Sequence, residues 1–336
     1  MFITSTGDMR QFLLTARNNS ELKTDLNRLV NELTSGKVAD ITSHLGSRQS
    51  SLAGFDRTLE MLGRYEQANS ETGNMLATMQ TVLGGIEARR EAASGALMLT
   101  NPSSNLPQIE NASQIAKSSF IDTIHSLNTR HNDRAVFGGN DVDSNPMAAP
   151  EVILDALRAT LAGATTEADV KNAITTWFDT PGGGFDMVAY QGDNTGVMSR
   201  MVDFNQNVQI DVRADDVAIK DTLKALALGA FAGDQTLAFS NETRRSLQRQ
   251  AGEDLLGVAS SLTHLQAQLG FTEARVEDSA VRVFAQQSAV GIARNELVAA
   301  DPFDTATRLQ SIQIQLETQY TLTARLSRLS LVEYLR

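Results

Sequence analysis

Leucines recur along the first 36 residues with the period of a coiled-coil helix. They are Leu22, Leu26, Leu29 and Leu33. Spacings of four, three and four residues place them on one stripe of a helix. The pair Ser35-Gly36 comes next, and a glycine after the last apolar turn is typical of a helix end. The pattern therefore predicts an N-terminal helix that stops at Gly36.

A second and longer apolar stripe begins near Ser47. Its members are Leu52, Phe55, Leu59, Leu62, Leu76, Met79, Leu83, Ile86, Ala93 and Leu97. A polar patch around Asn69 divides it, and Asn101-Pro102 ends it, because the residue before proline is disfavoured in a helix. This spacing predicts a long helix that packs along most of its length.

The strongest heptad of the chain lies in its second half. Every seventh residue is apolar at Leu255, Leu262, Leu269, Val276, Val283, Val290 and Leu297. Globular core helices rarely keep one stripe for so many turns, so a long bundle helix is predicted. We interpret this stripe as intramolecular core, since apolar heptads more often pack within a chain than between subunits.

The last 36 residues repeat the pattern of the first. Asp301-Pro302 interrupts the preceding helix, and proline suits the first turn of the next one. The apolar positions that follow are Leu309, Ile312, Leu316, Leu322, Leu326, Leu329 and Leu335. Neither end of the chain can bury its stripe alone, so the two ends must pair with each other or with other subunits. We favour assembly, and predict that both terminal stripes form an assembly interface.

The middle of the chain follows a different pattern. Short strands are expected at 134–137, 186–190 and 208–212, and helices at 150–162, 167–178 and 215–228. The predicted fold is mainly α: a long helical bundle with paired terminal coiled-coil helices and a small α+β central insertion. Three parts are expected: a terminal coiled-coil domain (1–36 plus 301–336), a long-helix bundle (37–136 plus 217–300) and a solvent-facing insertion (137–216).

Charge is concentrated in that insertion. Residues 137–216 hold 13 acidic and 4 basic residues, which gives −9 of the total formal charge of −11. Binding to nucleic acid or to an anionic membrane surface depends on clustered lysine and arginine, so this balance argues against both. The longest apolar stretch, at 225–232, is too short to span a bilayer, and no cleavable signal peptide is visible.

Candidate chemistry is sparse. There is no cysteine, and His44, His125, His131 and His264 lack the three- or four-residue spacing of metal ligands on one helical face. The run 141–145 mimics the start of a calcium loop. However, Pro146 replaces the glycine of the sharp turn and Val152 replaces the bidentate glutamate. Phosphate-binding loops and nucleophile elbows are also missing. We therefore predict no enzyme activity, no metal and no cofactor.

Five short segments stand out, in this order: 28–37 (ending in Ser-Gly-Lys), 136–139 (Val-Phe-Gly-Gly), 190–193 (Tyr-Gln-Gly-Asp), 300–309 (beginning Ala-Asp-Pro) and 329–335 (Leu-Ser-Leu-Val-Glu-Tyr-Leu). Together they resemble the flagellins and their hook–filament junction relatives, the hook-associated protein 3 family. The ending is similar to that of the junction proteins, whereas flagellins finish with a different leucine-rich tail.

The resemblance implies a structural adaptor that joins the flagellar hook to the filament outside the cell. The terminal helices would form the inner tube, and the insertion would face solvent. The implied partners are flagellin, hook-associated protein 1, other copies in a ring and a flagellar export chaperone; nucleic acid and membrane are not expected. Export would use the flagellar type III apparatus without a cleaved signal peptide. The alternatives are a short flagellin that polymerises by itself and, in another class, a coiled-coil signalling or secretion-tip protein.

Overall fold

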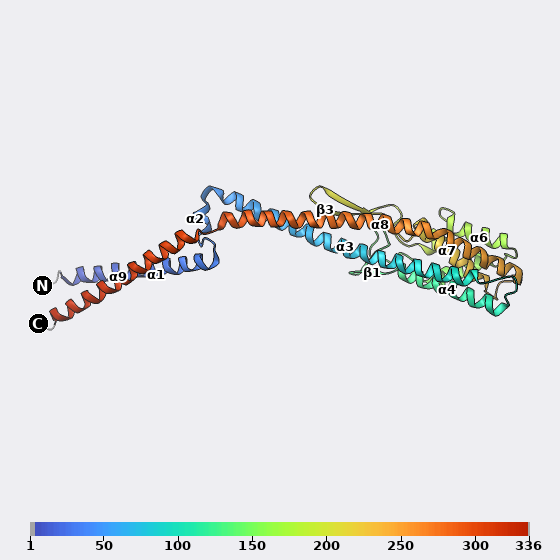
Figure 1. The fold of residues 1–336 in the computed structure, drawn as a ribbon, viewed down its shortest axis with the longest axis horizontal. Helices are drawn as coiled ribbons and strands as arrows, with labels where there is room; N and C mark the ends of the chain where they lie inside the picture. Colours follow the sequence, from blue (N-terminus) through green and yellow to red (C-terminus); the bar gives the residue numbers. More distant parts are fainter. Residues whose placement is uncertain (1–3, 335–336) are drawn as a thin grey trace. The chain divides into compact units, whose positions relative to one another are not determined.

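A computed structural model describes residues 4–334, of which residues 4–8, 11 and 326–334 are described by their backbone alone. The fold is mainly α, as predicted (Figure 1). The chain forms two compact units, one of residues 1–63 and 285–336 and the other of residues 64–284. Two long helices, α3 (Gln49–Met98) and α8 (Asn241–Val298), contribute to both. The three-part division expected from the sequence stays a prediction.

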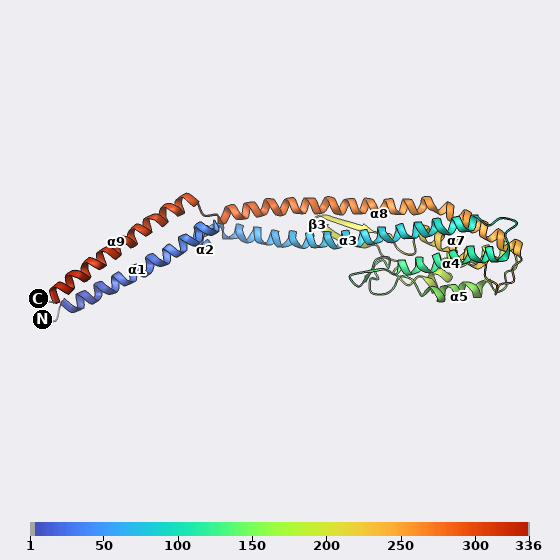
Figure 2. The same ribbon diagram turned by 60° about the horizontal axis from the view of Figure 1, so that its bottom comes forward.

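The first unit contains the two terminal helices. Helix α1 spans Thr4–Ser35 and α9 spans Pro302–Tyr334, and the two lie side by side (Figures 1 and 2). Between α1 and α3 come the short helix α2 (Ile41–Leu45) and a 3₁₀ turn at Gly46–Arg48. The predicted end of the first helix at Ser35-Gly36 is confirmed, and so is the start of the last helix at Pro302.

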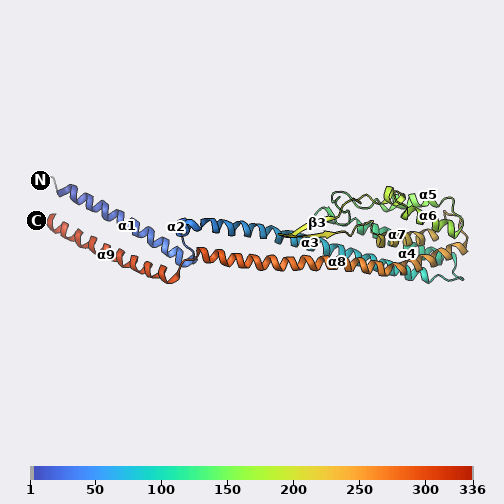
Figure 3. The same ribbon diagram turned by 90° about the horizontal axis from the view of Figure 1, so that it is seen from above.

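In the second unit, α3 and α8 run beside two further helices, α4 (Leu106–Leu127) and α7 (Val217–Ala232) (Figure 3). Helix α7 is buried on nearly all sides, which its almost continuous apolar sequence requires. Helix α4 was not predicted. Its apolar positions, from Ile109 to Leu127, alternate with serine, asparagine and glutamine, and a capping box between Asn105 and Gln108 begins it.

The heptad stripe of α8 supplies much of the core. Leu255, Leu262, Leu269, Val276 and Val283 are buried, which confirms their interpretation as intramolecular core. Val290 and Leu297 are half-buried. Side chains also reach from α3 to the backbone of α8. Gln80 donates to the carbonyl oxygen of Gln266 at 2.9 Å, and Ser94 donates to that of Gly252 at 3.0 Å.

The insertion has the predicted α+β character. Helices α5 (Pro150–Leu161) and α6 (Glu167–Asp179) lie close to the predicted ranges. Strands β3 (Met198–Asp203) and β4 (Gln206–Ile210) form an antiparallel hairpin, of which only β4 was predicted. A smaller hairpin pairs β1 (Arg130–His131) with β2 (Arg134–Ala135).

The strand predicted at 186–190 is wrong. Residues Phe185–Ala189 form a π-helical turn, labelled η2, in which the backbone N–H of Tyr190 donates to the carbonyl oxygen of Phe185 at 2.9 Å. The turn places both aromatic rings in the core, where they stack with centroids 6.4 Å apart, while Met187 points to solvent. An alternating strand could not bury two rings five positions apart on one face.

Candidate assembly site

The terminal helices meet along the stripes that the sequence identified. Leu29 on α1 and Leu316 on α9 are buried, and four further members are half-buried: Leu22, Leu26, Leu309 and Ile312. Pairing of the two ends with each other, one of the two arrangements left open by the sequence, is therefore present within a single chain.

The structure does not show the remaining members of the predicted interface buried between the two helices. Leu33 and Leu322 are exposed large apolar residues. Leu326 and Leu329 lie on α9, where only the backbone is described, and Leu335 lies outside the described residues. The pairing of α1 with α9 thus covers only part of the two predicted stripes. Their role in contacts between subunits stays a prediction.

A second set of apolar side chains on the same two helices faces solvent, and the stripes did not predict it. Its members are Met9, Phe12, Leu13, Leu14, Val30, Phe303, Ile314 and Tyr320. Phe12 is 70% exposed and Ile314 is 56% exposed. Isolated exposed apolar residues are ordinary, but so many on one helix pair are typical of a surface that another protein covers. The three consecutive apolar residues at 12–14 are the feature of the sequence that could have indicated this exposed set.

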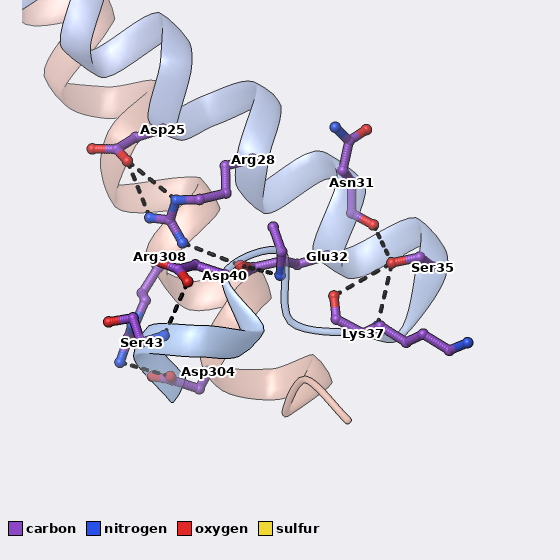
Figure 4. A network of polar contacts seen from close by, with 11 residues as sticks. Asp25, Arg28, Asn31, Glu32, Ser35, Lys37, Asp40, Ser43, Asp304 and Arg308 are labelled. Carbon is purple, nitrogen blue, oxygen red and sulfur yellow. Dashed lines mark hydrogen bonds and ion pairs between the residues drawn. The ribbon is translucent and has the colours of Figure 1, made fainter. Parts of the chain in front are cut away.

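Polar contacts fix the C-terminal end of α1 (Figure 4). The Glu32 carboxylate is buried and accepts hydrogen bonds from Arg28 Nη1 at 3.2 Å and from the backbone N–H of Ala39 at 3.0 Å. Arg28 also donates to Asp25, at 3.1 Å from Nη2. These bonds, first to Asp25 and then to Glu32, raise the pKa of Arg28 against the opposing effect of burial. The buried charge of Glu32 is thus paired, as its burial requires.

The chain reverses direction directly after this network. Gly36 has φ of 65°, a left-handed conformation that glycine adopts without strain, and its carbonyl oxygen accepts from the N–H of Ala300 at 3.0 Å. The N–H of Val38 donates to the carbonyl oxygen of Val298 at 3.0 Å. The segment that leaves α1 is therefore bonded to the segment that enters α9.

Side chains also set the start of each neighbouring helix. Asp40 accepts from the N–H of Ser43 at 3.0 Å and caps α2. Asp301 accepts from the N–H of Phe303 at 2.8 Å and caps the start of α9. A carboxylate at a helix N-terminus accepts hydrogen bonds from free N–H groups and interacts favourably with the positive end of the helix dipole. Asp40 thus orders the segment that follows α1, and Asp301 orders the start of α9.

The described residues offer little for chemistry. No group of three histidine, aspartate or glutamate side chains among them is placed to hold a metal ion. In the calcium-like run, Asp141 accepts from the N–H groups of Asp143 and Ser144, each at 3.2 Å, and so forms the turn expected of it. Burial raises the pKa of the Tyr190 hydroxyl, which donates to the carbonyl oxygen of Asp193 at 3.0 Å. Within 4–334, no helix is long and apolar enough to cross a membrane.

Comparison with known proteins finds a partial family match and a shared fold. Residues 234–335 match the family model of the bacterial flagellin C-terminal helical region. The structure resembles a flagellar hook-associated protein of Vibrio parahaemolyticus, with a TM-score of 0.52, 10% identity, and 75% of this chain and 97% of that one covered. FlgL of Bacillus cereus aligns with a TM-score of 0.49 and 13% identity over 73% of this chain and 98% of that one. No curated protein sequence matches the chain.

Residues 234–335 are thus similar to the C-terminal helices of bacterial flagellin, and the chain shares its fold with the Vibrio parahaemolyticus protein. The resemblance predicted from its short segments is thereby confirmed, and the match at 234–335 contains the two C-terminal segments that carried it.

Proposed function

We propose that this chain is a structural adaptor that joins the flagellar hook to the flagellin filament through its terminal helices. The exposed apolar surface of the α1–α9 pair carries the proposal. Phe12, Ile314 and Leu322 are each more than half exposed in the single chain. Covering apolar surface contributes about 25 cal/mol per Å², so neighbouring subunits that cover these side chains would stabilise an assembly.

Within this surface, two groups of residues have different roles. Leu29 and Leu316 hold the two helices of one chain together, whereas Leu33, Leu322 and the exposed set contact neighbours. The half-buried members of the predicted interface lie at the boundary and contribute to both. The role is mechanical, with rigid helices that transmit force and no reaction to catalyse.

An adaptor between hook and filament would contact the proteins on both of its sides. Hook-associated protein 1 lies on the hook side, flagellin lies on the filament side, and further copies of the chain complete a ring outside the cell. The chain reaches that place through the flagellar export apparatus, in an unfolded state and with a chaperone. Its lack of cysteine is compatible with such a route. The segment 137–216, which carries most of the negative charge, faces solvent.

A short flagellin that polymerises along the filament is the second candidate. The C-terminal segment 329–335 favours the adaptor, because its sequence is similar to the ending of the junction proteins. The two candidates differ in where the protein accumulates and in how much of it one flagellum holds.

Immunogold electron microscopy of intact flagella, with antibody against residues 141–212, tests the proposal. We expect label in one narrow band between hook and filament. Label along the whole filament would make the chain a flagellin, and unlabelled flagella would contradict both candidates. Flagella from a strain that lacks the gene serve as the control for the antibody.

A further inference from the structure

A groove of about 830 Å³ runs between α3 and α8 in the second unit. Small residues form much of its lining, among them Gly73, Ala77, Gly270 and Ala274. Phe284 stands at its edge with 67% of its surface exposed. Small side chains let another chain approach the helix backbones closely, and an exposed ring offers apolar area to it.

Polar and acidic residues also line the groove. Asn69 lines it and is only 3% exposed, yet neither amide atom has a hydrogen-bond partner among the described residues. A buried amide without partners is costly, so a polar side chain that reaches it gains hydrogen bonds. Glu66, Glu273 and Glu277 line the same groove, and none of its described lining residues is a lysine or an arginine.

A cavity of about 280 Å³ with the opposite charge lies on another side of α3. His131, Arg134 and Arg200 line it, and Glu71 is the one acidic residue among its described lining residues. In the described part of the chain, the guanidinium groups of Arg134 and Arg200 make no hydrogen bond and no ion pair. Both cations are therefore available to an acidic partner.

The two sites lie at the same level of α3 and on opposite sides of it. The basic cavity is lined from this helix by Ala68, Thr72 and Met75, and the acidic groove by Ser70, Gly73 and Ala77. At 3.6 residues per turn, the centres of these two sets are about half a turn apart. Faces of opposite charge on opposite sides of one subunit are what a head-to-tail interface requires, and a ring repeats such an interface.

We propose that the acidic groove of one copy receives the basic cavity face of the next copy. The inference rests on the proposed function, because it requires a ring of identical subunits. Arg134 and Arg200 of one copy would approach Glu273 and Glu277 of its neighbour, and Phe284 would be covered. The interface is head-to-tail, so each copy contributes one groove and one basic face.

Chemical crosslinking tests this arrangement, because the natural chain has no cysteine. Glu71→Cys places a thiol in the basic cavity, and Ala77→Cys places one in the groove. In intact flagella treated with a short bismaleimide, the double variant should give dimers and longer ladders, while either single variant stays monomeric. The matched control combines Glu71→Cys with Gln114→Cys, an exposed position on α4 that lies in neither site, and should also stay monomeric.

The outcomes separate the two proposals. If the double variant gives only monomers, in flagella that carry the labelled junction band, the proposed interface is overturned and the adaptor role stays intact. Dimers from a single variant would show a two-fold interface and would also overturn it. Absence of the protein from flagella would contradict the adaptor role and the interface together.

Charge reversal gives an independent test. Arg134→Glu with Arg200→Glu sets like charges against each other and should lower the amount of protein in flagella by ~10-fold or more. Adding Glu273→Arg and Glu277→Arg to the same chain should restore it, because every copy then carries both reversed faces. Arg249→Glu, at an exposed position in neither site, controls for the effect of reversing a surface charge elsewhere. If the variant with all four substitutions folds but its amount in flagella stays low, the proposed pairing of the two faces is contradicted.

Discussion

Arg90 Nη1 donates a hydrogen bond of 3.0 Å to the carbonyl oxygen of Leu255 and so joins α3 to the backbone of α8. Arg90 is 6% exposed and stands seven residues from both Leu83 and Leu97, at a core position of its helix. The rest of its guanidinium binds the carboxylate of Glu87, at 2.9 Å from Nε and 2.8 Å from Nη2. A charged side chain thus occupies the core because each of its three guanidinium nitrogens donates a hydrogen bond.

Arg90→Ala should therefore destabilise the second unit by about 2–4 kcal/mol. The substitution removes the bond to α8, leaves a cavity and deprives Glu87 of its partner. Urea unfolding followed by circular dichroism measures the change. Arg249→Ala, at an exposed position on α8, should stay within about 0.5 kcal/mol of the natural chain. Equal losses from both variants would contradict the buried role of Arg90.

Gly184 should not tolerate a side chain, because a Cβ atom there would overlap the indole ring of Trp177. Gly184→Ala should lower the free energy of unfolding by about 1–3 kcal/mol, the usual cost of overpacking. Trp177 is the only tryptophan of the chain, so its fluorescence reports the change directly. Gly163→Ala is the matched control, because open space surrounds that position and its φ is not positive. An unchanged emission and midpoint for Gly184→Ala would contradict this packing.

The sequence predicted the long helices well because their signals are local. Gly36 ends α1 and Pro302 begins α9, and the heptad from Leu255 to Val283 is buried as its spacing indicates. Helix α4 was missed because serine and asparagine dilute its apolar stripe. The turn at Phe185–Ala189 was assigned to a strand because its form depends on burying two aromatic rings, which is a tertiary effect.

The candidate site was predicted only in part, for a similar reason. The heptad of Leu22–Leu33 identifies the stripe that can pack, but it does not say how much of that stripe one partner helix covers. Leu29 and Leu33 belong to the same stripe, and only the first is buried by α9. The charged faces on α3 were also missed, because they combine residues from α3 with residues more than 50 positions away in sequence.

Glu32→Ala should loosen the chain reversal after α1 without unfolding the second unit. The carboxylate of Glu32 holds the backbone N–H of Ala39, seven residues further along the chain. Once it is removed, hydrogen exchange of the amides of 37–40 should become faster, and Arg28 should keep only its bond to Asp25. Glu21→Ala, which breaks only an exposed pair with Arg17, should leave the exchange unchanged. Unchanged exchange in Glu32→Ala would show that the network does not hold the reversal.

Asp234 should make the stability of the second unit depend on acid pH. Burial opposes its ionised form, but hydrogen bonds from Thr236 and from Arg158 Nε, 3.1 Å away, outweigh burial and lower the pKa of Asp234. Because the folded pKa lies below the unfolded value of about 3.9, the stabilisation is present above that pH and is lost as the pH falls through the folded pKa. Unfolding midpoints measured between pH 5 and pH 2.5 should fall less steeply for Asp234→Asn than for the natural chain. Parallel slopes would contradict the prediction.

The two apolar faces of α9 should respond differently to the same change of charge. Leu316 is 8% exposed and packs toward α1, whereas Ile314 and Leu322 are 56% and 53% exposed. Leu316→Asp places a charge without a partner in the helix pair, so the terminal helices of the monomer should lose helical signal and become sensitive to protease. Ile314→Asp with Leu322→Asp should leave the monomer as helical as the natural chain, because the new charges lie in water.

Incorporation into flagella then shows what the exposed face does. If neighbouring subunits cover Ile314 and Leu322, the double variant should fold normally and be absent from flagella, since assembly would bury both charges. Glu317→Gln, an exposed position on the same helix, controls for a general effect of surface substitution. The measurement is the amount of protein in purified flagella relative to the amount secreted. Normal incorporation of the double variant would show that this face stays in solvent, and the assembly interface would then have to lie on α1.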